Sequence, residues 1–218
     1  MKQKHEFCHM QILLTAATEN ELELFINLYS NVDILITGVG TPATIYNLQR
    51  RLQQEEYHYV IQAGIAGAFS NELNLAETVL VKQDSFGDIG AEENQTFTSF
   101  IGSPLINAHA FPYADGWLMN TEGMPKNSNL KAVKGITVNK VSDSMLQKQQ
   151  LINAFNPQIE TMEGAGFHFV CLQEAIPFVQ IRAISNYVGE RDKTKWKMKE
   201  AFENLNTELV NLISKLKD

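Results

Sequence analysis

The chain is poor in cysteine, in positive charge and in long apolar runs. Its two cysteines, Cys8 and Cys171, form no CxxC pair and are too few for a disulfide framework. Lysine and arginine total 18 against 25 acidic residues, which gives a net charge of −7. Binding to nucleic acid needs a basic face, so we expect no nucleic-acid partner. A nucleotide-sized ligand is compatible with this charge.

No apolar run approaches the ~18 residues that a membrane-spanning helix requires. Residues 1–9 are polar and lack the apolar centre of a signal peptide. These absences predict a cytoplasmic protein that makes no membrane contact. We expect a short flexible leader at residues 1–9 and one domain at residues 10–218, a length that suits a single packed α/β unit.

Motifs for metals and common cofactors are also missing. The five histidines form no HxxxH or HxH pair, so we expect no metal. The loop Gly38-Val39-Gly40 stops short of GxGxxG because position 43 is alanine, and no Gly-Lys-Ser/Thr follows it. The sequence therefore predicts neither a dinucleotide site nor a P-loop, and we expect no cofactor.

What the chain does contain is an alternation of apolar runs and helical patterns. The predicted strands are 11–16, 32–37, 57–63, 78–82, 135–141, 159–162 and 177–184. The predicted helices are 19–29, 42–56, 143–155, 164–174 and 196–216. Residues 84–130, with scattered glycine, proline and asparagine, are expected to form long loops around short strands. This order predicts a single-domain α/β fold, a three-layer α/β/α arrangement around a mixed, largely parallel twisted sheet.

Polar residues gather just after the predicted strands. In parallel sheets, ligands bind beyond the carboxyl ends of the strands, so these residues are candidates for a site. They are Thr18, Glu19 and Glu21, the glycine loops 38–41 and 64–69, Met162 and Glu163, and Ser185 and Asn186. The set offers carboxylates and an amide, with no thiol nucleophile and no GxSxG.

Residues 159–192, IETMEGAGFHFVCLQEAIPFVQIRAISNYVGERD, resemble the signature region of the purine nucleoside phosphorylase and nucleosidase superfamily. That superfamily pairs a Met-Glu-Gly-Ala segment with a strand ending Arg-Ala-Ile-Ser-Asp or Ser-Asn. MQILLTAATENEL and VIQAGIAGAF resemble its first strand and the floor of its ribose site, so the resemblance runs from about Met10 to the end. It implies a nucleoside phosphorylase-like fold, a small-molecule purine nucleoside as substrate, and a homo-oligomer, a dimer or larger.

Three details resemble one branch, the futalosine hydrolases. They are Asn186, where methylthioadenosine/adenosylhomocysteine nucleosidases carry aspartate, the tail Val-Gly-Glu-Arg-Asp near Trp196, and the segment Phe-Gly-Asp-Ile-Gly-Ala-Glu at 86–92. The branch implies hydrolysis of futalosine to hypoxanthine and dehypoxanthine futalosine, in menaquinone biosynthesis. A methylthioadenosine/adenosylhomocysteine nucleosidase and a purine nucleoside phosphorylase remain alternatives.

The resemblance also implies roles for individual residues. Glu163 would accept hydrogen bonds from both ribose hydroxyls, and Met162 would pack against the sugar. Glu21 aligns, without gaps from Met10, with the general base of family nucleosidases, and Glu19 stays open as the alternative. The glycine turns are expected to let the ligand approach the backbone, at Gly40, Gly64 and Ala66.

Asn186 is expected to bind the departing base. An amide presents both a donor and an acceptor, so its NH₂ can meet the 6-oxo group of hypoxanthine while its carbonyl meets a protonated N7. An aspartate suits the 6-amino group of adenine instead. Asn186 therefore predicts a 6-oxopurine, with Ser185 supporting the loop or the base edge.

The arginine count favours water over phosphate as the nucleophile. A phosphate cradle needs arginine and backbone donors, and the chain has only four arginines. Arg182 is internal to its strand and is expected to be structural, pairing with a carboxylate. Loop aromatics are open candidates for the wall against a carboxyphenyl arm, and no residue is assigned to that arm: Phe86, Phe97, Phe100 and Trp117.

Overall fold

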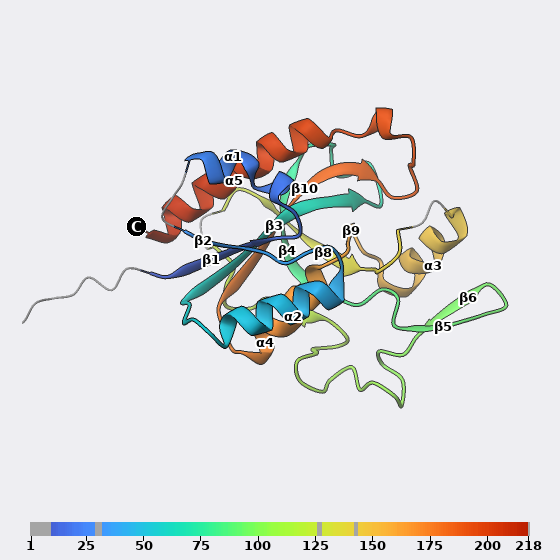
Figure 1. The fold of residues 1–218 in the computed structure, drawn as a ribbon. Coiled ribbons are helices and arrows are strands. Elements are labelled where there is room, and N and C mark those ends of the chain that lie inside the picture. Colours follow the sequence, from blue (N-terminus) through green and yellow to red (C-terminus); the bar gives the residue numbers. More distant parts are fainter. Residues whose placement is uncertain (1–9, 29–31, 126–127, 142–143, 218) are drawn as a thin grey trace, which may run out of the picture.

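A mixed sheet lies between two layers of helices in the computed structural model of the chain (Figure 1). The structure describes residues 10–28, 32–125, 128–141 and 144–217. The leader expected at residues 1–9 lies outside the described residues.

Eight strands form the main sheet, in the order β10-β4-β8-β9-β3-β1-β2, with β7 paired to β4. Their bounds are β1 Ile12–Ala16, β2 Asp33–Ile36, β3 Tyr59–Ala68, β4 Thr78–Asp84, β7 Leu118–Met119, β8 Lys131–Thr137, β9 Ile159–Thr161 and β10 Phe178–Tyr187. Five of the pairings are parallel and three are antiparallel. The mixed, largely parallel sheet expected from the sequence is confirmed.

Strand β3 also pairs directly with β10. The pairings β3–β10, β10–β4, β4–β8, β8–β9 and β9–β3 therefore close into a circuit. A closed circuit leaves no free edge along these five strands and holds their ends in a fixed relation. This end of the sheet carries the site described below.

Helices cover both faces of the sheet. Helices α2 (Thr41–Leu52) and α4 (Gly164–Gln173) lie on one side, where Leu48, Phe167 and Val170 are fully or almost fully buried against strand residues. Helices α1 (Glu23–Leu28) and α5 (Met198–Lys217) lie on the other (Figure 1). The apolar stripe of α5 is buried there: Ala201, Leu205, Leu209, Leu212 and Ile213. This arrangement confirms the predicted three-layer architecture.

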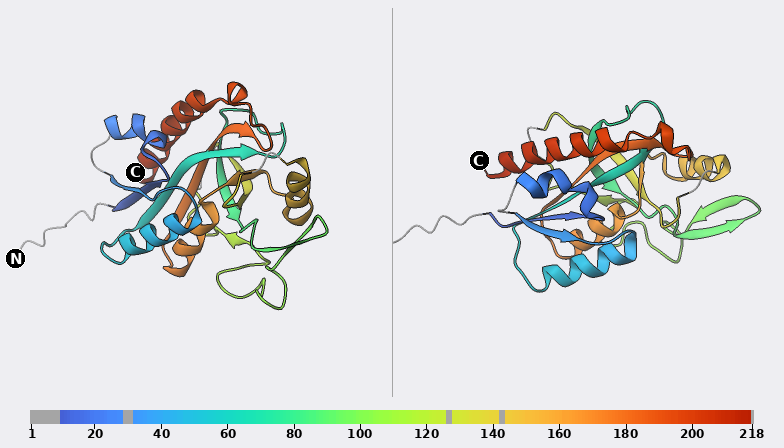
Figure 2. Two further views of the ribbon diagram at one scale, coloured as in Figure 1. Left: turned by 45° about the vertical axis from the view of Figure 1, so that its right-hand side comes forward. Right: turned by 45° about the horizontal axis from the view of Figure 1, so that its top comes forward.

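The segment between β4 and β8 is largely irregular, as expected from its composition. Strands β5 (Gly90–Glu93) and β6 (Thr96–Ser99) form a separate hairpin that projects from the body (Figure 2). Helix α3 (Met145–Phe155) packs beside it. The centre of the Phe155 ring lies 6.4 Å from that of Phe97 and 6.3 Å from that of Trp117. The helix predicted to begin at residue 143 begins at Met145, and residue 143 lies outside the described residues.

Two strands are longer than their apolar runs predict. β3 continues through the small residues Gly64 to Ala68 because they pair with β10 and β9. The predicted glycine turn after residue 63 is therefore wrong. β10 likewise runs to Tyr187, so Ser185 and Asn186 lie inside the strand and not after it.

Two further elements differ from the sequence prediction. The helix expected at 19–29 is a 3-10 turn at Glu19–Glu21 followed by the short α1, and its backbone is held by the Asn206 side chain of α5. The later strand predicted at 135–141 lies at 131–137. A second 3-10 turn covers Lys193–Lys195.

Within the described residues, no helix is long and apolar enough to cross a membrane.

Candidate active site

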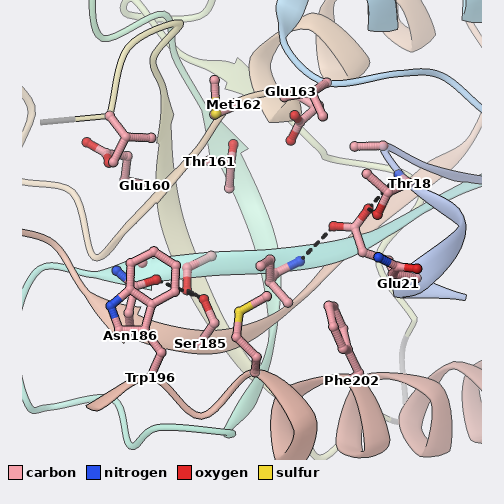
Figure 3. Close-up of a pocket in the computed structure, with 18 residues that line it drawn as sticks. Thr18, Glu21, Glu160, Thr161, Met162, Glu163, Ser185, Asn186, Trp196 and Phe202 are labelled. Atoms are coloured by element: carbon pink, nitrogen blue, oxygen red, sulfur yellow. Dashed lines mark hydrogen bonds between the residues drawn. The ribbon is translucent and has the colours of Figure 1, made fainter. Parts of the chain in front are cut away.

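A cavity of about 390 Å³ opens where β3, β9 and β10 meet the turn after β1 and the start of α5 (Figure 3). The predicted site residues Glu21, Met162 and Glu163 line it together. So do Ala66, Ser185 and Asn186. Gly40 and Gly64 do not line the cavity, and their neighbours Val39 and Ile65 do. The structure thus brings six of the eight predicted residues to one cavity.

Glu21 is held in place by backbone donors at the end of its 3-10 turn. Its Oε2 accepts a hydrogen bond from the Thr18 amide at 2.9 Å, and its Oε1 accepts one from the Ile65 amide at 3.2 Å. The residue is 5% exposed. Glu19, the alternative from the sequence, is exposed and lies outside the cavity lining. Geometry therefore favours Glu21 as the acid that can act on a ligand.

Glu163 occupies the N-cap position of α4, where the chain turns from β9 into the helix. Its Oε1 accepts a hydrogen bond from the Gly40 amide at 3.0 Å. Gly40 has a φ of +90°, a conformation that disfavours side chains, so the glycine makes this close approach possible. Gly40 thus serves the site by holding Glu163.

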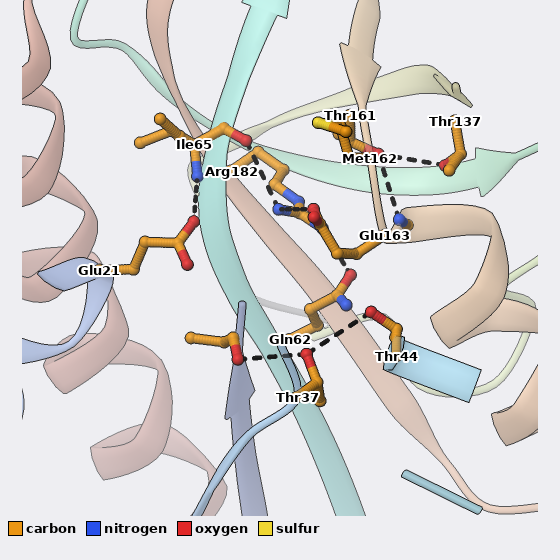
Figure 4. A network of polar contacts seen from close by, with 12 residues as sticks. Glu21, Thr37, Thr44, Gln62, Ile65, Thr137, Thr161, Met162, Glu163 and Arg182 are labelled. Carbon is orange, nitrogen blue, oxygen red and sulfur yellow. Dashed lines mark hydrogen bonds and ion pairs between the residues drawn. The ribbon is translucent and has the colours of Figure 1, made fainter. Parts of the chain in front are cut away.

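Arg182 is the buried cation behind the two acids (Figure 4). Its Nη1 lies 3.7 Å from Glu163 Oε2, and its Nη2 donates to Gln62 Oε1 at 2.6 Å. Only 1% of the residue is exposed, and the expected pairing with a carboxylate is present. A Cβ at Gly64 would lie 2.2 Å from Arg182 Nη1 and 2.8 Å from Glu21 Oε1. The missing side chain at Gly64 therefore leaves room for the Arg182 guanidinium and the Glu21 carboxylate.

The electrostatics suit a proton acceptor at Glu21. Burial raises the pKa of Glu21, and the charge of Glu163 raises it further. Arg182 and the hydrogen bonds from the backbone oppose this rise. A carboxylate whose pKa is raised toward neutrality is a better general base than an ordinary surface glutamate.

The first turn of α4, which carries Glu163, rests on a chain of buried hydroxyls. The Gly164 amide donates to Thr161 Oγ1 at 3.1 Å, and the Ala165 amide donates to Thr137 Oγ1 at 2.7 Å. Thr137 in turn donates to Asp84 Oδ1 at 3.0 Å. The amides at the helix start are thereby satisfied by strand residues, which fixes the direction of the turn.

Asn186 and Ser185 both face the cavity because β10 is irregular here. The register of β10 against β3 shifts between Ile184 and Asn186, so Ser185 is an extra residue in the strand. A bulge of this kind breaks the usual alternation of side chains. The Ser185 hydroxyl donates to Asn186 Oδ1 at 2.8 Å. Sequence periodicity cannot reveal such a bulge, because it depends on the partner strand.

The orientation of the Asn186 amide follows from its neighbours. Its Nδ2 donates to the Tyr187 carbonyl at 3.1 Å, and a carbonyl can only accept. One N–H and one lone pair of the amide remain for a ligand. That pair of groups is complementary to a ligand edge with an acceptor beside a donor.

Several lining residues were not predicted as site residues. Trp196, Met198 and Phe202 give the cavity an apolar wall, whereas the loop aromatics considered from the sequence pack elsewhere. Phe86 packs near Phe169, and Trp117 packs against Phe155. The proximity of Trp196 to the strand end in the sequence was the one signal that could have found this wall.

Glu160 is a further lining residue that sequence reasoning missed. It is 8% exposed, and burial raises its pKa to about 7.

Among the described residues, no group of His, Cys, Asp and Glu could hold a metal ion. His168 is fully buried, shares a hydrogen bond with the Leu118 carbonyl, and has a pKa lowered to about 4 by burial, as befits a packed residue.

The chain matches the family model described as "Phosphorylase superfamily" over residues 11–216. Among curated proteins, it is 29% identical over 174 residues to the futalosine hydrolase of Thermus thermophilus, covering 78% of this chain and 76% of that protein. It is 26% identical over 201 residues to the 5'-methylthioadenosine/S-adenosylhomocysteine nucleosidase of Colwellia psychrerythraea, covering 86% and 81%.

Solved structures share the fold at lower identity. Futalosine hydrolase of Helicobacter pylori superposes with a TM-score of 0.76 at 16% identity, covering 95% of this chain and 98% of that one. The Colwellia psychrerythraea nucleosidase in complex with adenine gives 0.74 at 20% identity, with 96% of each chain covered. The overall fold is therefore shared with both kinds of protein.

Proposed function

The chain belongs to the phosphorylase superfamily, and from this premise we propose that it hydrolyses the N-glycosidic bond of a purine nucleoside, with futalosine as the substrate. The observation that carries the proposal is the meeting of Glu21, Glu163 and Asn186 in one cavity. Cleavage of this bond builds positive charge on the sugar and negative charge on the base. The three residues match the three tasks that follow.

Glu163 binds the sugar. Its carboxylate can accept hydrogen bonds from two ribose hydroxyls and places negative charge near the developing cation. Arg182 stands behind it and keeps it from carrying an uncompensated buried charge. Met162, which also lines the cavity, packs against the sugar.

Glu21 activates the attacking water. In ionised form it takes a proton from a water as the water oxygen bonds to the anomeric carbon and the bond to the base breaks. Its two backbone hydrogen bonds fix the carboxylate without using all of its lone pairs. A general base placed in this way contributes about 10²–10⁴-fold to the rate.

Asn186 binds the departing base. As the bond breaks, N7 takes up a proton from solvent water; the carbonyl of Asn186 accepts a hydrogen bond from this N7–H and its free N–H donates to the 6-oxo group, so hypoxanthine leaves as a neutral base. The Ser185 hydroxyl holds the carbonyl in this orientation. An adenine would present its 6-amino donor to the amide N–H, so this pattern supports a 6-oxopurine.

Hydrolysis is favoured over phosphorolysis by the charges at the cavity. Among the described residues that line it, there is no lysine or arginine to cradle a phosphate. Arg182 is turned toward Glu163 and Gln62. The apolar wall of Trp196, Met198 and Phe202 suits the carboxyphenyl arm of futalosine.

The substrate assignment is tested by base release. Purified protein is incubated with futalosine, inosine or methylthioadenosine, with and without phosphate, and the free base is measured by chromatography. We expect hypoxanthine from futalosine at a rate that does not depend on phosphate. Adenine released from methylthioadenosine while futalosine stays intact would favour the alternative nucleosidase, to which the chain is also related. A requirement for phosphate would indicate a phosphorylase.

Assembly into a homo-oligomer and a cytoplasmic location remain predictions from the sequence. Sedimentation of the purified chain tests the first. A sedimentation coefficient that corresponds to the 24.5 kDa monomer at micromolar concentration would contradict it.

A further inference from the structure

Glu160 is a buried carboxylate that faces the cavity without a hydrogen-bond donor among the described residues. It is 8% exposed, and it lines the same cavity as Asn186 (Figure 3). A buried carboxylate that lacks a donor is costly, and a donor on a ligand would remove that cost. The residue has no part in the reaction steps given above.

Strand pairing places Glu160 and Asn186 on either side of Gly67. Glu160 of β9 is the register partner of Gly67, and so is Asn186 of β10. Directly paired residues send their side chains to the same face, and each strand spacing is about 4.8 Å. The backbones of Glu160 and Asn186 are therefore about 10 Å apart, and Gly67 lies between them. Gly67 lines the cavity with them, and a Cβ there would lie 3.1 Å from Val188 Cγ2 and 3.4 Å from Asn186 Nδ2, so only a glycine fits between the two polar residues.

A 6-oxopurine and a 6-aminopurine differ at two adjacent ring positions. The 6-oxopurine has an acceptor at O6 and a donor at N1–H. The 6-aminopurine has a donor at its amino group and an acceptor at N1. When Asn186 binds the N7 and O6 side of the ring, N1 lies on the next edge of the ring, which Glu160 can reach from the other side of Gly67. An ionised carboxylate there accepts from N1–H and repels the lone pair of the other base.

We propose that Glu160 is a second base-recognition residue, whose carboxylate binds N1–H of a 6-oxopurine and rejects a 6-aminopurine. The inference rests on the proposed function, because it takes the cavity to be a purine nucleoside site with the base beside Asn186. It adds a contact on the ring edge that Asn186 does not reach.

The protonation state of Glu160 makes this selection dependent on pH. Burial raises the pKa of Glu160 to about 7; the charge of Asp88, in the loop after β4, raises it as well. Arg191, in the loop after β10, and Lys148 of α3 lower it. Above this pKa the carboxylate accepts from N1–H. Below it the carboxyl group can donate to N1 of a 6-aminopurine, so the preference for the 6-oxopurine rises as the pH rises through about 7.

The test is the binding of the free bases, which requires no turnover and no substrate arm. The dissociation constants of hypoxanthine and adenine are measured by calorimetry between pH 5.5 and 8 for the natural chain, for Glu160→Gln, and for Glu93→Gln as the matched control. Glu93 is exposed on the hairpin away from the cavity. At pH 8 we expect Glu160→Gln to bind hypoxanthine about 10- to 100-fold more weakly, with a smaller change for adenine. The control should bind both bases as the natural chain does.

The pH series adds a readout that needs no variant. In the natural chain, the ratio of the two affinities should shift toward hypoxanthine by about tenfold or more across the series, and in Glu160→Gln it should stay flat. A flat ratio in the natural chain, or an unchanged preference in Glu160→Gln, overturns the inference.

Failure of the inference can be told from failure of the proposed function. If futalosine is hydrolysed and Glu160→Gln keeps its preference, only the role of Glu160 is wrong. If futalosine is not hydrolysed but Glu160 still governs the preference for hypoxanthine, the substrate is wrong and the inference stands. If futalosine is not hydrolysed and neither base binds, both are wrong.

Discussion

The guanidinium of Arg182 lies 3.7 Å from the carboxylate of Glu163 and is the cation that acts on Glu21 and Asp84. Its charge lowers the pKa of Glu21 and that of Asp84. One positive charge therefore compensates several carboxylates at once. A change at Arg182 therefore alters the pKa of Glu21 and that of Asp84.

Replacement of Arg182 by methionine is expected to impair both stability and catalysis. Breaking a buried ion pair leaves an uncompensated charge and costs about 3–5 kcal/mol of unfolding free energy. The pKa of Glu21 should rise when Arg182 no longer opposes its burial, so the acid limb of the kcat/KM profile should move to higher pH. Denaturant titration and a pH–rate profile measure the two effects. Arg50→Met, on the exposed side of α2, is the control and should change neither.

Replacement of Glu21 by glutamine should remove the general base and leave the shape of the cavity. We expect kcat to fall by about 10²–10⁴-fold, while hypoxanthine binds as before because Glu21 is not on the base side of the cavity. Steady-state kinetics and calorimetry separate the two quantities. Glu19→Gln is the matched control two residues away. If that variant loses activity and Glu21→Gln keeps it, the base has been assigned to the wrong residue.

Replacement of Asn186 by aspartate should move the preference from hypoxanthine toward adenine. The aspartate has no N–H to offer to the 6-oxo group but can accept from a 6-amino group. A mismatch at one buried hydrogen bond costs about 1–3 kcal/mol, which is about 5- to 150-fold in the ratio of affinities. Competitive binding of the two bases measures it. A variant that kept the ratio of the natural chain would show that Asn186 does not contact the base at position 6.

Replacement of Asp84 by asparagine should change how stability depends on pH. Burial raises the pKa of Asp84 from 3.8 to about 7, so the folded chain binds this proton more tightly than the unfolded chain does. The corresponding stability is present below about pH 4 and is lost as the pH rises through about 7.

The asparagine variant avoids that loss and can still accept from Thr137 and from the Ser85 amide through its oxygen. Relative to the natural chain it should gain up to about 4 kcal/mol between pH 4 and pH 8, at 1.36 kcal/mol for each unit of pKa shift. Denaturant titrations at several pH values decide this. A difference between the two chains that does not vary with pH would mean that Asp84 is ionised at no unusual cost.

Local patterns predicted the fold well because they report on burial along each element. The apolar stripe of α5 and the apolar runs of β1 and β10 each predict a buried face. The family resemblance, confirmed by the match over residues 11–216, pointed to Glu21, Glu163 and Asn186. The segments that were misread, the glycines of β3 and the end of β10, take their conformation from partner strands far away in the sequence.

The supporting residues of the site were harder to predict for the same reason. Glu160 gives no signal until β9 is known to pair with Gly67. Arg182 was expected to pair with a carboxylate, but the sequence does not show that this carboxylate is Glu163. Asp84 lies about fifty residues before the hydroxyl that it anchors, Thr137. Each of these relations depends on strand order, which a single sequence does not display.

Strand β10 carries both the cation behind the acids, Arg182, and an amide that lines the cavity, Asn186. The two lie four positions apart on a rigid ladder, with a bulge between them. Any displacement of β10 therefore moves the guanidinium and the amide together, so the charge behind the acids and the polar group in the cavity keep a fixed spacing.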